Sequence, residues 1–381
     1  MICRSYQNWK FPRVVPVIGI VVLLLGTFRL YGGAYFSMDD FNNLDLVREE
    51  SLGQTLGHIL NPVSSYFRPV GLMCYWLTLR FFDLNPAAYH WLAWLLHAAN
   101  TAFVYFVLKQ LTGSRAGAAV GAMLFASQFV FEAIYWDFGN IFDPVAAFFS
   151  LVGILLWISE RRRWSHVLIA SLALYLAVKG KEMALTMPII WVSYDLLLRK
   201  NMDRKMAAHW VLPSGLALWY GVTKIANGSA AVPSMNEVVP PWHPYYMSVR
   251  GSTLAQGFGE YFNMLFRTYF PWQVWCLCAV ALLLIFVLLR SRLALFFQLY
   301  VFFAFLPVIF LINHRVNHYW YLPFLGIAGF GAMLGKSVTS VIETRNPQWL
   351  ATSGASAVFV LLCWSSFLLH KNTMKGAPRA R

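Results

Sequence analysis

Two groups of carboxylates in this chain could take part in proton transfer. Asp39 and Asp40 are adjacent and follow the first long apolar run, and Asp137 and Asp143 lie in a short outer loop further on, where either could join the first pair at one site. Neighbouring carboxylates repel each other, which tends to raise the pKa of one of them. Such a group can accept a proton from an attacking hydroxyl, or it can help to hold a divalent cation. The alternative interpretation is an acidic loop in contact with solvent.

A second cluster carries cations where an apolar run ends. Residues 179–182 read Lys-Gly-Lys-Glu, with Lys181 directly before Glu182. Two cations at this position suggest an anionic partner, such as a lipid phosphate. They could equally be lysines that extend to the membrane surface, with Glu182 as a local counter-ion.

A third cluster, residues 314–323, combines basic and aromatic side chains in the order His-Arg-Val-Asn-His-Tyr-Trp-Tyr-Leu-Pro. Arg315 can grip a phosphate through two parallel hydrogen bonds. His314 and His318 are four residues apart, which is a metal-like spacing on a helix, but one such pair is weak support for a metal. The aromatic residues 319–321 also fit the aromatic belt of a membrane protein.

The elements that position these clusters are predicted to be membrane-spanning helices. Hydrophobic residues make up 59% of the 381-residue chain and charged residues only 12%, about half the charged fraction of a soluble protein. The apolar runs are continuous rather than alternating, which favours helices, and a span needs about 20 such residues. We expect an all-α polytopic protein with 11 spans, at residues 14–31, 87–111, 116–135, 144–159, 165–178, 184–198, 208–225, 272–289, 293–312, 321–335 and 350–369.

The spans leave two long polar segments in what is expected to be a single domain, residues 1–381. Residues 32–86 form a large first outer loop with helices near 54–60 and 68–82, the second of them interfacial. Residues 226–270 form a second long outer loop. The first apolar run is interpreted as an uncleaved span because no clear small-residue cleavage site follows it, and no soluble C-terminal domain is expected.

The net charge of +14 indicates topology rather than a nucleic-acid partner. Basic residues, such as Arg161, Arg162 and Arg163, concentrate in short loops between apolar runs, which is the pattern of cytoplasmic loops. The three clusters described above all fall on the opposite, extracytoplasmic side. The basic C-terminal tail is an exception to the pattern. The five cysteines show no metal-binding spacing.

The clusters also belong to an ordered set of short motifs. The set comprises Asp39-Asp40, Phe67-Arg68-Pro69-Val70, Tyr89-His90-Trp91-Leu92, Leu96-His97-Ala98, Lys181-Glu182 and Tyr319-Trp320-Tyr321-Leu322-Pro323.

In order and spacing this set resembles the GT-C superfamily of polytopic glycosyltransferases, which use polyprenyl-phosphate sugars. The closest likeness is to the transmembrane part of the tetratricopeptide-repeat O-mannosyltransferases and their bacterial relatives. The resemblance implies 11 spans, a large first outer loop and a catalytic acid within the Asp39-Asp40 pair. Two features depart from the family: His318 stands where arginine is frequent, and no tetratricopeptide repeats follow. The acceptor, whether lipid, glycan or protein, is therefore left open.

These observations lead to one principal hypothesis. An integral membrane enzyme, in a bacterial inner membrane with its site facing the periplasm or exterior, transfers one sugar from a polyprenyl-phosphate donor with inversion. Asp40 or Asp39 would act as the base, while Arg315, Lys181 and His318 would bind the donor phosphate. The supporting residues are Arg68, Glu182, Asp143 and Tyr321. The only cofactor suggested is a divalent cation.

Two alternatives remain at this stage. A transporter or lipid flippase would need charged or broken helices at mid-membrane depth, whereas the charges here lie mainly at the ends of spans. A non-catalytic scaffold is the other alternative, although the chain retains both its acidic pair and Lys181-Glu182.

Overall fold

The computed structural model describes residues 20–21, 24–26, 35–64, 66–199, 204–227 and 239–345. Within these ranges the secondary structure is helical, and pairing between extended segments is limited to one isolated bridge between Met247 and Leu311. This confirms the all-α prediction for the described part of the chain. Most of the expected first span, the whole of the last one and the C-terminal tail lie outside the described residues.

The described α-helices follow the apolar runs with a few additions. In chain order they are α2 (Met38–Arg48), α3 (Leu52–Leu60), α4 (Pro69–Phe82), α5 (Pro86–Thr112), α6 (Arg115–Ala126), α7 (Glu132–Trp136), α8 (Phe142–Trp157), α9 (Trp164–Gly180), α10 (Met187–Leu198), α11 (Arg204–Ala208), α12 (Val211–Asn227), α13 (Gly251–Phe266), α14 (Trp272–Leu288), α15 (Arg292–Phe305) and α16 (Phe324–Arg345).

Two expected spans are shorter than predicted. The helix expected at 293–312 ends at Phe305, because Pro307 has no N–H to donate and its ring clashes with the carbonyl of the fourth residue before it. The helix expected at 116–135 ends at Ala126. The apolar run continues there as a 3₁₀ turn that packs Phe131 against Tyr321, with ring centroids 4.8 Å apart. A run of apolar residues predicts burial, but it does not distinguish a straight helix from a bent one.

The outer-loop helices α3 and α4 confirm the helices expected near 54–60 and 68–82. Two further helices, α2 and α13, lie in segments that were predicted to be polar loops. The start of α2 is fixed by a capping box, in which the Ser37 hydroxyl accepts from the Asp40 N–H and the Asp40 carboxylate accepts from the Ser37 N–H. This local device, rather than an apolar face, sets where α2 begins.

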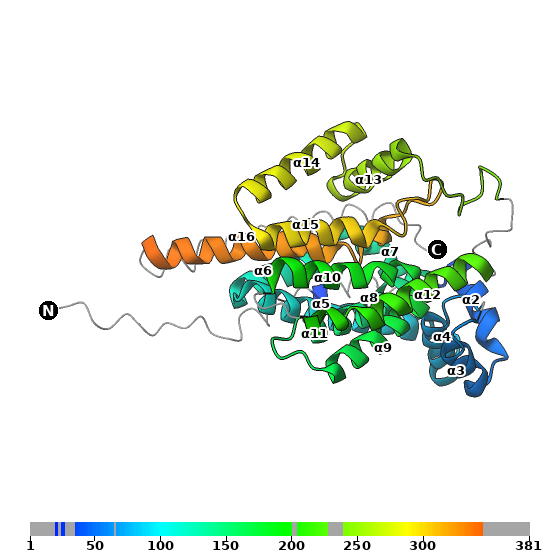
Figure 1. The fold of residues 1–381 in the computed structure, drawn as a ribbon. Helices are drawn as coiled ribbons and strands as arrows, with labels where there is room; N and C mark the ends of the chain where they lie inside the picture. Colours follow the sequence, from blue (N-terminus) through cyan, green and yellow to red (C-terminus); the bar gives the residue numbers. More distant parts are fainter. Residues whose placement is uncertain are drawn as a thin grey trace.

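The helices form an elongated bundle with distinct ends. Figure 1 shows α10, α15 and α16 running along its length, with α2, α3 and α4 gathered at one end. At the C-terminal ends of α5 and α8, Gln110 Nε2 donates to the Ile158 carbonyl at 2.9 Å, and Lys336 Nζ donates to the Thr112 carbonyl at 2.7 Å. These contacts join the end of α5 to the end of α8 and to α16, where the sequence predicts cytoplasmic loops.

The pair formed by α6 and α16 depends on small residues. Gly117 and Gly121 on α6 are four residues apart, as are Gly331 and Gly335 on α16. An added Cβ at Gly335 would lie 3.2 Å from the Gly117 Cα, and one at Gly121 would lie 2.5 Å from the Ala328 carbonyl oxygen. Small residues at this spacing let two helix backbones approach closely, as is common for helices packed in membranes.

The surface of the bundle is apolar in a manner suited to lipid. Among the described residues, α5 and the segment Phe138–Trp157 are long and apolar enough to cross a membrane, with mean hydropathies of 1.4 and 1.7. The apolar helix α14 has no buried side chain, and Leu288 is 79% exposed. Large exposed apolar surfaces mark interaction sites, membranes among them. The number of spans stays a prediction.

The close approach of α6 and α16 predicts a position-dependent effect of one substitution. Gly121→Ala should destabilise the protein by about 1–3 kcal/mol, because the new methyl group has no space. Gly57→Ala, the same change in α3, meets nothing within 4 Å and should be neutral or slightly stabilising, since alanine favours helices. Thermal unfolding in detergent, followed by tryptophan fluorescence, measures both. Equal melting temperatures for the two variants would contradict this packing.

The alternation of helix ends predicts the topology of the loops. A reporter fused after Arg163 should be cytoplasmic, and one inserted within residues 51–62 should be external. Paired alkaline phosphatase and fluorescent-protein fusions distinguish the two sides. An external signal after Arg163 would be incompatible with the predicted order of spans.

Candidate functional site

A cavity of about 330 Å³ opens at the end of the bundle that carries α2 and α4. Its walls come from α2, the start of α4, the turn before α8 and the end of α9. The loop that contains Tyr245 and the segment 314–319 complete them. The lining residues are Asp39, Asn42, Asn43, Leu46, Phe67, Arg68, Gly139, Asn140, Phe142, Lys181, Tyr245, His314, His318 and Tyr319. Members of all three sequence clusters therefore meet here.

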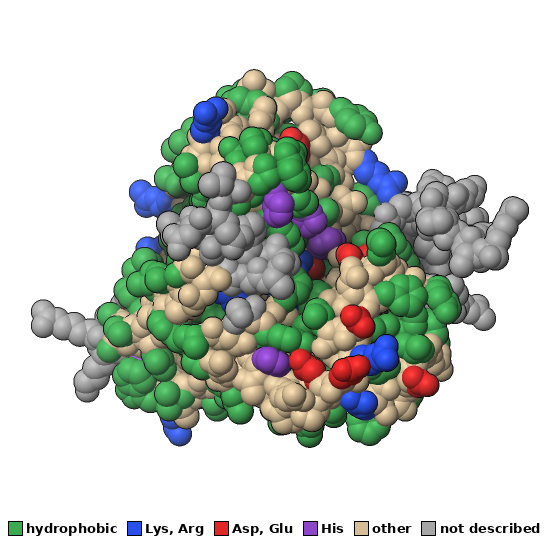
Figure 2. Space-filling view, turned by 90° about the vertical axis from the view of Figure 1, so that its right-hand side faces the viewer, with side chains coloured by type: hydrophobic (Ala, Val, Ile, Leu, Met, Phe, Trp, Pro, Cys, Tyr) green, Lys and Arg blue, Asp and Glu red, His purple; other side chains and the backbone are tan. Residues whose placement is uncertain are grey.

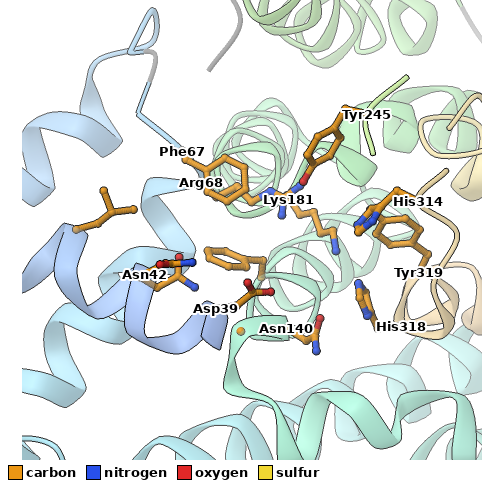
Figure 3. A pocket seen from close by; sticks show the side chains of 14 residues that line it. Asp39, Asn42, Phe67, Arg68, Asn140, Lys181, Tyr245, His314, His318 and Tyr319 are labelled. Atoms are coloured by element: carbon orange, nitrogen blue, oxygen red, sulfur yellow. The ribbon is translucent and has the colours of Figure 1, made fainter. Parts of the chain in front are cut away.

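The charged and aromatic side chains surround the cavity from several sides. Figure 3 shows Asp39 and Asn140 on one side, with Arg68 and Lys181 across from them and His314, His318 and Tyr319 beside Lys181. In the view onto this end, histidine side chains lie near the middle of the face and acidic side chains gather on one side of them (Figure 2).

The two adjacent carboxylates have different environments. Asp40 is fully buried: its Oδ1 accepts from the Tyr75 hydroxyl and its Oδ2 from the Ser37 N–H, both at 2.7 Å. Burial raises the pKa of Asp40, although these hydrogen bonds oppose the increase. Asp39 is exposed and lines the cavity. Consecutive side chains on a helix point about 100° apart, so α2 directs one carboxylate into the core and the other toward the cavity.

Arg68 lies at the start of α4 in an uncommon backbone conformation. Its φ of 44° and ψ of 56° fall in the left-handed region, which costs a non-glycine residue about 1 kcal/mol or more. Its Nε and Nη2 contact Glu182 Oε2 at 3.0 and 2.9 Å, and the guanidinium lies over the Phe67 ring. Burial is the largest single influence and would raise the pKa of Glu182. The charge and hydrogen bond of Arg68, a backbone hydrogen bond and the charge of Lys181 together outweigh burial, so the pKa is lowered.

Lys181 is a buried cation held on two sides. Its Nζ lies 2.5 Å from Asp143 Oδ2 and 4.5 Å from the centre of the Tyr319 ring. Burial lowers the pKa of Lys181 to about 8, although the Asp143 carboxylate favours the protonated form. Lys181 therefore remains a cation below about pH 8 and loses its charge above it.

His314 and His318 contribute neutral imidazoles. Burial lowers the pKa of both, and the positive charge of Lys181 lowers it further. His318 Nε2 lies 3.9 Å from Asp143 Oδ2, which is too long for a hydrogen bond. At neutral pH these rings can donate or accept hydrogen bonds at the cavity wall but add no charge to it.

Besides Asp40, which is buried on the core side of α2, two more residues predicted to belong to the site lie elsewhere. Arg315 Nη1 contacts Glu260 Oε1 at 2.6 Å, and its Nε donates to the Leu311 carbonyl, so the side chain ties its loop to α13. The Tyr321 hydroxyl lies 2.8 Å from His97 Nδ1 in the buried core. Neither lines the cavity. Sequence proximity to His314 and His318 is a poor guide here because the loop turns Arg315 away from them.

Several cavity residues were missed by sequence reasoning. Asn42 lies three residues after Asp39, so recognising α2 as a helix would have placed both on one face. Asn140 Nδ2 donates to Asp137 Oδ2 at 2.9 Å in the turn before α8. Tyr245 comes from a segment without periodicity, and no sequence signal pointed to it.

A glycine lets α2 approach this turn. An added Cβ at Gly139 would lie 2.9 Å from Asp137 Oδ1 and 3.0 Å from the Asp39 Cβ. Ser37, just before α2, also donates to Asp137 Oδ1 at 2.7 Å. The turn and α2 are therefore joined directly beneath the exposed carboxylate.

Within the described residues, no three His, Cys, Asp or Glu side chains are grouped so that they could hold a metal ion. Neither a scan against protein-family models nor a search of curated proteins finds a match for this chain.

Chemically, the cavity combines an exposed carboxylate with two cations whose charges Glu182 and Asp143 already compensate. Such cations act on an anion at hydrogen-bonding distance rather than through a long-range field.

The different environments of the adjacent carboxylates predict different stabilities for two variants. Asp40→Ala should lower the free energy of unfolding by about 1–3 kcal/mol, because it leaves the Tyr75 hydroxyl and the Ser37 N–H without their acceptor. Asp39→Ala should stay within about 0.5 kcal/mol of wild type, as is usual for exposed positions. Thermal unfolding measures the difference. A larger loss for Asp39→Ala would reverse the assignment of the two side chains.

Proposed function

We propose that this protein is a polytopic membrane glycosyltransferase that moves one sugar from a polyprenyl-phosphate donor to an acceptor hydroxyl on the extracytoplasmic side. One observation carries the proposal: an exposed carboxylate, Asp39, shares a small cavity with two anchored cations, Arg68 and Lys181. The ordered motifs that resemble the GT-C superfamily support the choice of donor. The apolar outer surface, with no buried side chain on α14, supports a multi-pass arrangement. We place the protein in a bacterial inner membrane with the site facing the periplasm or exterior.

The proposed reaction assigns a role to each side chain at the cavity. Asp39 takes the proton of the acceptor hydroxyl, and the oxygen attacks the anomeric carbon of the donor sugar. The bond between that carbon and the phosphate oxygen breaks, and the electron pair leaves with the lipid phosphate. Arg68 and Lys181 stabilise the charge that develops on the phosphate. Attack opposite the leaving group inverts the anomeric centre.

The carboxylate partners prepare the cations for this role. A buried cation without a counter-charge is costly and tends to lose its proton. Asp143 favours the ionised form of Lys181 before a donor arrives, and Glu182 compensates the permanent charge of Arg68. Both carboxylates fix the positions of the charged groups. His318 is well placed to donate a neutral hydrogen bond to a phosphate oxygen. Asp40 and Arg315 become structural residues in this scheme.

The location of the cavity makes a transporter the weaker choice. A transport site is expected near the bilayer midplane, at broken helices. The cavity instead lies at the end of the bundle, beside α2 and α4. Its carboxylate and cations face one small space rather than lining a path along the helices.

Removing the proposed base should abolish transfer while leaving donor binding in place. Asp39→Asn should reduce the transfer rate by about 10²–10⁴-fold, because an amide cannot accept the proton. Glu49→Gln, an exposed acidic residue at the end of the same helix, is the matched control and should keep the wild-type rate. The assay follows radiolabelled mannose or glucose from its polyprenyl phosphate into membrane acceptors. Wild-type transfer by Asp39→Asn would reject the assigned base.

Donor binding should depend on the two anchored cations. Arg68→Ala and Lys181→Ala should each weaken binding of a radiolabelled polyprenyl-phosphate sugar about tenfold or more, the value of a hydrogen bond to a charged group. Arg315→Ala, if folded, and the exposed Arg161→Ala should bind as wild type does. Binding to purified protein in nanodiscs measures all four. Weaker binding only in Arg315→Ala would move the phosphate site to α13, and no binding to wild type would reject the donor class.

The pH dependence of donor binding gives a separate test of Lys181. Since burial lowers its pKa to about 8, the side chain is charged below that pH and loses its proton above it. Donor affinity should therefore be constant below about pH 8 and fall as the pH rises further. The Lys181→Ala variant should lack this fall. An equally steep decrease in that variant would assign the titration to another group.

A further inference from the structure

A second cavity, of about 730 Å³, opens between α2 and the end of α4. It lies on the face of α2 opposite the first cavity. Asp39 and Leu46 line the first cavity, whereas Phe41 and Arg48 line the second. Asn42 lines both. Asn42 therefore marks the place where the two cavities come nearest to each other along α2.

The charges that line this second cavity cancel one another. Two carboxylates, Asp45 and Asp83, and two guanidiniums, Arg48 and Arg80, are all exposed at its walls. Their formal charges sum to zero, so the cavity has no net attraction for an anion or a cation. It is instead dense in strong acceptors and donors, which suits a neutral ligand that carries many hydroxyl groups.

Arg80 is held in place before any ligand binds. Its Nη2 donates to the carbonyl of Arg48 at 3.1 Å and to that of Glu50 at 2.8 Å, and the guanidinium lies 5.7 Å from the centre of the Trp76 ring. A guanidinium has five N–H donors, so these bonds leave others for a ligand. A side chain that is already ordered loses less entropy on binding.

Asp83 is strained in a way that ordinary loop residues are not. Its φ of 51° and ψ of −145° are rare for a residue with a side chain. The Tyr89 hydroxyl donates to its carbonyl at 3.1 Å, and its own N–H donates to the Leu79 carbonyl at 3.0 Å. Strain of this kind costs about 1–3 kcal/mol and is concentrated at functional sites.

The apolar parts of the cavity indicate where its ligand resides. Phe41 and Leu84 are 52% and 57% exposed at its walls, and an aromatic ring offers a face against which the C–H side of a sugar can pack. Phe81 and Phe82, in the last turn of α4, are also largely exposed. Large exposed apolar side chains next to charged ones are typical of a protein segment at a membrane surface.

We propose that this second cavity binds the acceptor of the transfer reaction, as the neutral, hydroxyl-rich sugar chain of a membrane glycolipid. The inference rests on the proposed function and names its acceptor class. The cavity has more than twice the volume of the first, 730 against 330 Å³, so it has room for a longer saccharide than the single donor sugar. The sugar chain lies against Phe41 and the four charged side chains, its end passes Asn42 toward Asp39, and its lipid lies beside Phe81 and Phe82.

A photoreactive dodecyl maltoside, which carries a neutral disaccharide on an alkyl chain, tests this assignment without requiring catalysis. The purified full-length protein is incorporated into nanodiscs, irradiated with the probe and digested, and labelled peptides are identified by mass spectrometry. We expect labelling within residues 41–48 and 79–84. Because each lost charged hydrogen bond weakens binding about tenfold, the double variant Asp45→Asn, Asp83→Asn should lose most of the label. Glu49→Gln, on the same helix but outside the cavity, should keep it.

Competition experiments separate the sources of ligand. Unlabelled dodecyl maltoside should compete, whereas dodecyl phosphate and a free acidic peptide should compete poorly. Free maltotriose that competes as well as dodecyl maltoside would overturn the lipid-linked part of the proposal. Strong competition by dodecyl phosphate or the peptide, or unchanged labelling of the double variant, would overturn the sugar site itself.

The donor-site variant Arg68→Ala keeps this test independent of the proposed function. Arg68 does not line the second cavity, so its variant should label as wild type does even where donor binding is lost. Labelling at residues 41–48 together with an inactive donor site would leave a glycan-binding protein without the proposed transfer. Loss of labelling in an Arg68→Ala protein that unfolds at the wild-type temperature would show that the two cavities are not separate and would overturn the assignment. An Arg68→Lys variant, which keeps a charge beside Glu182, should label as wild type does and serves as the folded comparison.

Discussion

The pairing of buried cations with carboxylates is the constraint on which the architecture of this site depends. Arg68 with Glu182, and Lys181 with Asp143, each join segments that lie far apart in the sequence. Removing one partner from a buried pair such as Lys181 and Asp143 costs about 3–5 kcal/mol, because the other charge stays buried, and the cost is smaller for the partly exposed pair of Arg68 and Glu182. The pairs therefore hold the start of α4, the end of α9 and the start of α8 together. The cavity is the space left between these fixed segments and α2.

The sequence predicts the helices and the residue clusters of this site better than it predicts their contacts in three dimensions. Continuous apolar runs locate α5, α8, α9 and α14 to within a few residues, because a helix that is removed from water must be apolar along its length. The distribution of basic residues among the loops predicts that the three clusters lie on one side of the membrane. Contacts between distant segments cannot be predicted from local sequence in the same way. The sequence around Arg315 gives no sign that its guanidinium forms an ion pair with Glu260, on another helix.

The contrast between Asp39 and Asp40 shows that the position of one helix start can decide which residue lines the cavity. The sequence marks the pair, but only the register of α2 decides which carboxylate meets the cavity. That register is set by Ser37, whose hydroxyl and N–H bond with Asp40 and whose hydroxyl also reaches Asp137. Starting the helix one residue later would rotate each side chain by about 100°. A single capping residue thus directs one acid into the core and its neighbour toward the cavity.

Ion pairing alone does not make a site, as a comparison within the molecule demonstrates. Arg162 binds Asp195 through two hydrogen bonds of 3.0 and 2.8 Å, and its guanidinium lies 4.0 Å from the centre of the Trp157 ring. Both side chains are fully buried, so a ligand cannot reach either charge and the pair serves to join the chain segments around it. Arg68 and Glu182 differ because they retain 12% and 27% exposure beside a cavity that also holds Asp39. Partial exposure beside a cavity is what leaves this charged pair within reach of a ligand.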